Sequence, residues 1–259
     1  MLSYGPSWLY WFLSILAFSF FRMGNKNFIV AQRPRLSGSM IVGVLYSGGK
    51  DSNLALLEAS KYFEVACLIN VYPESAESAL FHYPASDMVD LQAEALELPL
   101  IRVETGDEEK EQLEALRTAL RAAKEEYDIR GVVTGAVKSV YQASRFQRIC
   151  DELDLWCFNP LWLIDEEKLV KRILAHGFKT LITRLAVYPF EEGFLGKFID
   201  EEFVDYLKKI GANVSGEGGE YETLVTWMPM FKKELKILEY SKINRESEGE
   251  IIVKKAELA

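Results

Sequence analysis

Histidine and cysteine are scarce in this chain. It has two histidines, at positions 82 and 176, and three cysteines, at positions 67, 150 and 157. The cysteines are odd in number and no two of them have CxxC spacing, which argues against a zinc site or a disulfide framework. This cysteine usage is typical of a reducing compartment, so we expect a cytoplasmic protein.

The sequence also has no apolar run long enough to cross a membrane. Its strongest run, Trp8–Phe21, falls short of the roughly 20 residues that a spanning helix needs. Basic residues follow this run, whereas in a secretory signal they precede it. The composition changes at Met40, so we expect residues 1–39 to be a disordered tail or to precede the true start of translation. A signal-anchor is the alternative, but we expect no membrane partner.

Positive charge is in deficit. The formal net charge is -9, and the first 39 residues hold four basic residues and no acidic one, so residues 40–259 carry -13. Proteins that bind extended nucleic acid neutralise its phosphates with clustered Lys and Arg. We therefore expect no nucleic-acid partner.

From Met40 onward, short β-branched runs alternate with longer segments of helical period. This alternation predicts an α/β fold with a doubly wound parallel sheet. The expected strands are residues 41–47, 64–72, 99–105, 131–137 and 155–162. Beyond residue 163 the rhythm changes to a smaller α+β region that ends in a predicted hairpin. We therefore expect two packed domains, 40–163 and 164–259.

The stretch SGGKDS, Ser47–Ser52, lies between the first of these strands and a helix. Gly48 and Gly49 let backbone N–H groups approach an anion, and the helix adds the positive end of its dipole. A Walker A loop would need glycine at Val44 and Ser or Thr at Asp51. The stretch is thus a different phosphate loop, or simply a glycine turn between strand and helix.

Asp51 has two interpretations. Its carboxylate can help hold Mg²⁺ on a polyphosphate, directly or through water. It can instead cap the helix by accepting loop N–H bonds, and we favour capping for the carboxylate itself while still expecting the metal.

Two further clusters follow along the chain. Gly135–Cys150 leaves the carboxyl end of the fourth strand, where open parallel sheets bind ligands, and Tyr141 and Arg145 can share a helix face there. Ser215–Val225 holds three glutamates among three glycines, which suits a cationic ligand with Tyr221 or Trp227 beside it. The plain alternatives are an ordinary surface helix and a solvated acidic turn.

The motifs together resemble the diphthine–ammonia ligase family of PP-loop ATP pyrophosphatases, in its short archaeal form. The motifs that carry the resemblance occur in order: SGGKDS, FHYP (residues 81–84), GAVKSVYQASRF with FNPLW, GFLGK (193–197) and GEGGEYETLV. The resemblance implies the PP-loop fold, with residues 40–163 binding ATP and 164–259 binding substrate. It implies amidation of diphthine on translation elongation factor 2, using ATP, Mg²⁺ and ammonium and releasing AMP and pyrophosphate.

Roles pass to this chain by position. The implied catalytic residues are Lys50, Asp51, Arg145, Glu217 and Glu220, with Asp51 at the metal. ATP would contact Ser47, Gly48, Gly49, Lys50, Asp51, Ser52 and Gly135, with Asn70 a guess for adenine. Substrate would contact His82, Ser139, Tyr141, Gln142, Arg145, Glu217, Glu220, Tyr221 and Glu222.

Three positions break the pattern of the eukaryotic members, GAILSDYQRxRVE. Val140 replaces an acid, Ala143 an arginine and Gln147 a glutamate, so no role passes to them. His176 is interpreted as a helix-end or surface residue.

Three other functions compete: a PP-loop enzyme that thiolates or lysidylates tRNA, an ATP-binding regulatory module, and amide ligation on a small molecule. Assembly into a homo-oligomer is compatible with the sequence.

Overall fold

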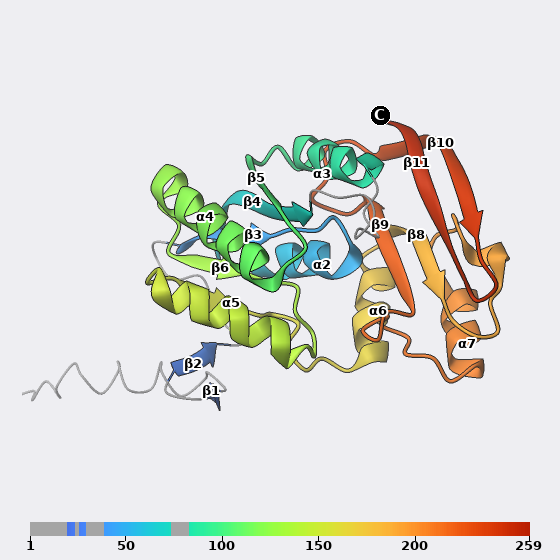
Figure 1. The fold of residues 1–259 in the computed structure, drawn as a ribbon, viewed down its shortest axis with the longest axis horizontal. Coiled ribbons are helices and arrows are strands. Elements are labelled where there is room, and N and C mark those ends of the chain that lie inside the picture. The colour runs from blue at the N-terminus through green and yellow to red at the C-terminus, as the bar shows by residue number, and fades with distance from the viewer. Residues whose placement is uncertain (1–19, 24–25, 30–38, 74–82) are drawn as a thin grey trace, which may run out of the picture.

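The computed structural model of the chain describes residues 20–23, 26–29, 39–73 and 83–259. Within these residues two sheets lie side by side, each with its own helices (Figure 1). The first is parallel and belongs to the amino-terminal half of the chain. The second is antiparallel and belongs to the carboxy-terminal part.

The parallel sheet has five strands in the order β5-β4-β3-β6-β7. Every neighbouring pair is parallel. The strands are β3 (Ile41–Leu45), β4 (Glu64–Pro73), β5 (Leu100–Thr105), β6 (Gly131–Val133) and β7 (Trp156–Phe158). All five correspond to predicted strands, although the predicted runs extend beyond the observed strands at β3, β6 and β7.

Helices cover both faces of this sheet. They are α2 (Lys50–Ala59), α3 (Tyr83–Leu96), α4 (Glu109–Tyr127) and α5 (Val140–Glu152). Alternate residues of one strand face opposite sides, so Val132 packs with α4 and α5 while Val133 packs with α2 and α3. Each face therefore has its own core. The predicted doubly wound α/β fold is confirmed.

The antiparallel sheet has the order β10-β11-β8-β9. Its strands are β8 (Lys179–Ala186), β9 (Tyr221–Trp227), β10 (Leu235–Asn244) and β11 (Glu248–Leu258). The helices of this part are α6 (Glu166–Ala175), the short 3₁₀ helix η1 (Glu192–Phe194) and α7 (Glu201–Lys209). Strands β10 and β11 form the predicted terminal hairpin.

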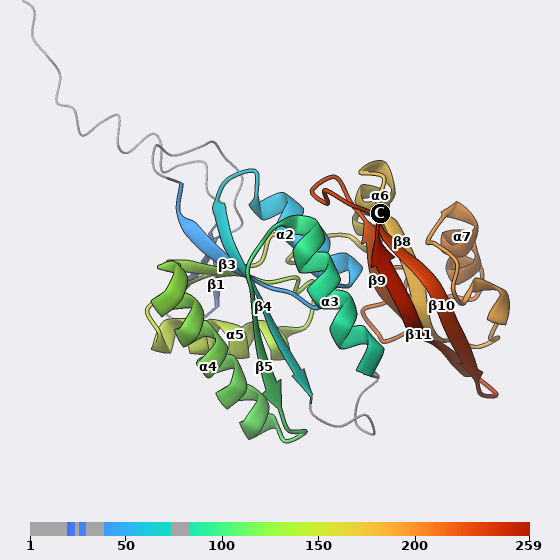
Figure 2. The same cartoon turned by 90° about the horizontal axis from the view of Figure 1, so that it is seen from above.

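The two sheets share a core, which fixes how they meet. Helix α3 packs against β10 and β11, and α2 meets β9, so these helices lie between the sheets (Figure 2). Buried residues of α2, α3, β8 and β9 belong to one apolar cluster. The start of α2 is thereby placed at the edge of β9. The division into domains at residue 163 stays a prediction.

Part of the first 39 residues forms a hairpin. Strands β1 (Phe20–Met23) and β2 (Lys26–Ile29) pair antiparallel, and β2 lies beside β7. The expectation of a disordered tail or a later start stays a prediction. Among the described residues, no helix has the length and apolar character of a membrane span.

Candidate active site

The loop Ser47–Ser52 joins the carboxyl end of β3 to α2. The helix begins at Lys50, and its N-cap, Gly49, has no side chain that could accept a hydrogen bond from the helix. Gly48 has a φ of +80°, a left-handed conformation that favours glycine. The Lys50 N–H donates to Thr223 of β9, which leaves the N–H groups of Asp51 and Ser52 for a ligand, as a phosphate loop requires.

Lys50 and Asp51 form an ion pair in the first turn of α2. The Lys50 Nζ lies 2.7 Å from Asp51 Oδ2, and the lysine is 4% exposed. Asp51 Oδ1 is buried, and none of the described residues offers it a hydrogen bond. The expectation that Asp51 caps the helix is wrong, because its carboxylate binds the neighbouring ammonium and not the loop N–H groups. A buried, unpartnered carboxylate oxygen suits a cation.

Lys50 stays charged in this setting. Burial alone would lower its pKa, but the charge and hydrogen bond of Asp51, with a smaller effect of the Glu217 charge, outweigh burial and raise it. The ammonium also lies 5.1 Å from the centroid of the Tyr221 ring. Burial raises the pKa of Tyr221 to about 12, so the phenol is neutral, and its hydroxyl donates to the Val214 carbonyl.

Strand β9 holds the loop from the carboxy-terminal part of the chain. The Lys50 N–H donates to Thr223 Oγ1 at 3.1 Å, and the Val225 N–H donates to the Gly48 carbonyl at 3.1 Å. Gln92 of α3 donates to both the Gly48 and Val225 carbonyls. Gln92 and Thr223 were missed by the sequence analysis, because neither stands at a recognisable position of a phosphate-loop motif.

The back of the loop is closed by polar contacts within the parallel sheet. Asn70 Nδ2 donates to the Tyr46 carbonyl, tying β4 to the end of β3. The Tyr46 hydroxyl donates to Asn53, whose amide donates in turn to the Gly49 carbonyl. A Cβ on Gly135 would lie 2.9 Å from the Ser52 backbone nitrogen, so the segment that follows β6 approaches α2 this closely only through glycine. Asn70 and Gly135 thus adjoin the loop, and their contacts with nucleotide stay predictions.

The Ser47 and Ser52 hydroxyls are 3.3 Å apart, across the loop from one another. Ser47 is exposed, and Ser52 is buried and donates to the Gly49 carbonyl. The six residues expected to contact phosphate therefore lie together.

Glu217 is the member of the acidic cluster that lies near the loop. Burial and then the charge of Asp51 raise its pKa, against the opposing effects of Lys50 and Lys138. The Lys138 backbone hydrogen-bonds to the Glu217 carboxylate. Residues from the loop, from the segment before α5 and from the segment before β9 therefore meet at one place.

Glu220 and Glu222 have other partners. The Glu220 carboxylate accepts backbone N–H bonds from Gly218 and Asn213, which stabilises the turn before β9. Glu222 is directed to Arg184, at 3.8 Å, while Tyr221 and Thr223 on either side of it contact Lys50. Side chains alternate along a strand, so Glu222 lies on the opposite face from these contacts. The structure does not bring the three glutamates together.

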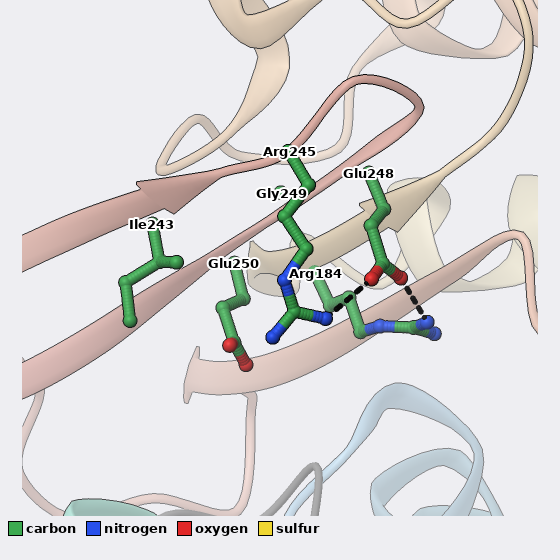
Figure 3. A pocket seen from close by; sticks show the side chains of 6 residues that line it. All are labelled: Arg184, Ile243, Arg245, Glu248, Gly249 and Glu250. Atoms are coloured by element: carbon green, nitrogen blue, oxygen red, sulfur yellow. Dashed lines mark hydrogen bonds and ion pairs between the residues drawn. The ribbon is translucent and has the colours of Figure 1, made fainter.

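Through Arg184, Glu222 adjoins a small cavity at the β10–β11 hairpin that has four charged side chains in its lining. The Glu248 carboxylate binds the guanidinium groups of Arg184 and Arg245, at 2.7 and 2.6 Å (Figure 3). These two partners, Arg245 first, lower the pKa of Glu248. Burial raises the pKa of Glu222, opposed by Arg184. Residues that line the cavity are Arg184, Ile243, Arg245, Glu248, Gly249 and Glu250.

The predicted cleft residues of the second cluster lie at the start of α5. The Ser139 hydroxyl accepts the Gln142 N–H and caps the helix. The Arg145 guanidinium stacks on the Tyr141 ring, so the two share a face as predicted. Hydrogen bonds from Arg145 and then Tyr141 lower the pKa of Glu109 on α4. Tyr141 is 56% exposed.

The two histidines lie in different parts of the chain. His82 lies outside the described residues. His176 is the C-cap of α6, with Nε2 3.9 Å from Glu58, which confirms its interpretation as a helix-end residue.

No group of three or more His, Cys, Asp or Glu side chains that could hold a metal occurs within the described ranges. Mg²⁺ at nucleotide sites takes one or two carboxylates, with phosphates and water supplying the rest. Asp51 offers one carboxylate oxygen without a partner among the described residues. One oxygen suits a nucleotide-bound Mg²⁺, but a metal held by protein side chains alone needs more ligands.

This sheet order, with a glycine loop entering α2 at the carboxyl end of the central strand, is that of an α/β nucleotide-binding protein. Comparison with known proteins gives the family. Residues 40–156 match the domain described as "Diphthamide synthase N-terminal domain", and residues 165–259 match "Diphthamide synthase C-terminal domain". The chain belongs to the diphthine–ammonia ligase family of enzymes, as the motifs indicated.

Named relatives agree with this assignment. The chain is 32% identical to mouse diphthine–ammonia ligase, over 76% of this chain and 82% of the mouse protein. It is 33% identical to the Schizosaccharomyces pombe ligase, over 80% of this chain but only 37% of that longer protein.

Among solved structures, a predicted subunit of a tRNA methyltransferase from Methanocaldococcus jannaschii aligns with 73% of this chain and 98% of its own, at 19% identity and a TM-score of 0.37.

Proposed function

We propose that this chain amidates diphthine on translation elongation factor 2. ATP transfers AMP to the diphthine carboxylate and pyrophosphate leaves. Ammonia then attacks the acyl carbon, and AMP departs as the amide forms. The acyl-adenylate is already activated, so positioning and charge stabilisation can supply most of the rate without a covalent nucleophile.

One observation supports this proposal above the rest. Lys50, Asp51 and Glu217 belong to two separate family motifs, and they interact at a single loop. Lys50 and the loop N–H groups would bind the β and γ phosphates, which become the leaving group. Asp51 would hold Mg²⁺, which neutralises phosphate charge when bound. Glu217 would hold the cationic group of diphthine or accept a proton from ammonium.

The remaining residues have supporting roles in the proposal. Ser139, Tyr141, Gln142 and Arg145 would contact the protein substrate, together with His82 and Tyr221. Glu220 acts by shaping the turn that carries Glu217. Glu222 lies on the face of β9 that is directed to Arg184, so it would contact substrate only on that face.

Catalytic cysteine chemistry, as in tRNA thiolation, has little support. Cys67, Cys150 and Cys157 are all buried. Burial raises the pKa of Cys67 to about 12, and a hydrogen bond with Cys157 and burial raise that of Cys150. Such thiols are poor nucleophiles. Their free state supports our proposal of a cytoplasmic location.

The test supplies ATP, Mg²⁺ and ammonium, with and without elongation factor 2 that carries diphthine. We expect amide on the factor and stoichiometric AMP, neither of which forms when the factor is omitted. ADP as product, or AMP release that is indifferent to the factor, would contradict the proposal.

A further inference from the structure

Gln92 is a buried polar residue of α3 to which no motif assigns a role. Its side chain is 0% exposed. Its Nε2 donates to the Gly48 carbonyl at 2.9 Å and to the Val225 carbonyl at 2.7 Å. These two acceptors fix the orientation of the amide, because the reverse orientation would point Oε1 at two carbonyl oxygens.

The other end of the same amide is left without a partner. Gln92 Oε1 is buried, and no hydrogen bond to it is found in the described part of the chain. An unsatisfied buried acceptor costs about 1–3 kcal/mol. The two hydrogen bonds that Nε2 donates are worth about 0.5–1.5 kcal/mol each, so they do little more than offset this cost, and stability alone does not account for a glutamine here.

The contact with Gly48 bears on the direction of the next N–H group. The Gly48 carbonyl accepts from both Gln92 and the Val225 N–H, which directs it into the protein. The Gly48–Gly49 peptide is trans, so the Gly49 N–H points the opposite way. On that side it meets only the exposed Ser47 hydroxyl, at the long distance of 3.5 Å. The Gly49 N–H is therefore held in a direction where it is available to an anion.

We propose that Gln92 is a positioning residue of the phosphate loop, which clamps the Gly48 carbonyl against β9 and so aims the Gly49 N–H at the bound phosphate. The inference rests on ATP binding at this loop, as proposed above. It makes α3 and β9 parts of the phosphate site although neither touches phosphate.

The test measures binding of a non-hydrolysable ATP analogue to Gln92→Met and Gln92→Glu. Methionine keeps the volume and donates no hydrogen bond. The Val225 N–H still holds Gly48, so we expect a loss of affinity of about tenfold with Gln92→Met, without loss of fold. Gln147 is the control, since this half-buried glutamine also has an Oε1 without a partner in the described ranges but bonds to Asp151 of its own helix. Gln147→Met and Gln147→Glu should bind like the wild type.

The pH dependence separates positioning from packing. A buried glutamate has a raised pKa, and its protonated form can donate one hydrogen bond. Affinity of Gln92→Glu should therefore recover as the pH falls from about 8 to about 6, whereas Gln92→Met should show no such recovery. Wild-type affinity in Gln92→Met, or identical pH profiles for the two variants, would overturn the proposal.

The unsubstituted protein gives a second measurement, which does not depend on the variants folding. In a nitrogen-15 spectrum, the analogue should shift the Gly49 N–H resonance strongly and leave the Gln92 side-chain amide hydrogens slow to exchange. An unmoved Gly49 resonance in a protein that binds the analogue would overturn the role of Gln92 alone. Failure of the wild type to bind the analogue would overturn the proposed function, and this inference with it.

Discussion

The Lys50 ammonium lies 2.7 Å from the Asp51 carboxylate, although the two residues are neighbours in the chain. This pair explains an acid beside the lysine of an anion-binding loop. The carboxylate offsets the cost of burying the ammonium, and its second oxygen stays available to a metal. One carboxylate can therefore serve both the lysine and the metal.

Replacing Lys50 should remove the charge that stabilises the departing pyrophosphate. We expect Lys50→Ala to lower AMP formation by at least about 100-fold, the effect typical of a lost charge-stabilising group. The measurement is AMP release in the presence of diphthine-bearing factor. Lys61→Ala, which removes a surface partner of Glu58, is the control and should be near wild type. Unimpaired turnover by Lys50→Ala would remove Lys50 from the site.

Asp51→Asn should weaken the response to magnesium. The amide keeps the shape but loses the charge that a hard cation prefers, so we expect the Mg²⁺ concentration for half-maximal activity to rise about tenfold. Asp90→Asn is a matched control, because Asp90 is also an ion-paired carboxylate but binds Arg102 at the surface. An unchanged Mg²⁺ requirement in Asp51→Asn would assign the ion to other ligands.

Glu217 should make stability depend on pH. Its folded pKa is raised above the ordinary 4.5, so the folded protein binds this proton more tightly than the unfolded chain. That contribution is complete below the unfolded pKa and is lost as the pH rises through the folded value. Glu217→Gln cannot ionise, so its free energy of unfolding relative to the wild type should rise between about pH 4 and pH 7. Urea denaturation at several pH values tests this, and a constant difference would contradict it.

Much of the site could be predicted from sequence because local patterns encode it. SGGKDS after a β-branched run places the loop, and the spacing of Tyr141 and Arg145 places them on one helix face. The alternation along β9 was also predictable. It shows that Tyr221 and Glu222 lie on opposite faces, but only the packing of β9 against α2 decides which face meets the loop.

The remaining parts depend on contacts between distant segments. Gln92 reaches Val225 across 133 positions and Lys50 reaches Thr223 across 173. No local period or motif marks such residues. The role of Asp51 as a cap was wrong for a related reason, since the competing partner, a buried Lys50, becomes apparent only once β9 covers the loop.

Gly48→Ala should destabilise the loop through two separate effects. The left-handed conformation costs about 1–2 kcal/mol for a residue with a Cβ. The new Cβ would also lie 2.4 Å from Gln92 Oε1, and overpacking adds about 1–3 kcal/mol. Gly219→Ala isolates the first effect, because its φ is +85° and nothing lies within 4 Å of the added atom. Both variants are compared by the loss in free energy of unfolding, measured by denaturation. Equal losses would mean that the Gln92 side chain moves away from the added Cβ without destabilising the protein.

Two threonine substitutions should have opposite effects on stability. Thr223 Oγ1 accepts the Lys50 N–H, so Thr223→Val leaves that donor without a partner and should cost about 1–3 kcal/mol. Thr180 is fully buried on β8, and its hydroxyl finds no hydrogen-bond partner among the described residues. Thr180→Val should therefore be neutral, or stabilise by about 1 kcal/mol, since it removes an unsatisfied polar group. Thr223→Val should also weaken ATP binding, while Thr180→Val should not. Equal stability and equal ATP affinity of the two variants would show that the Thr223 contact does not hold the loop.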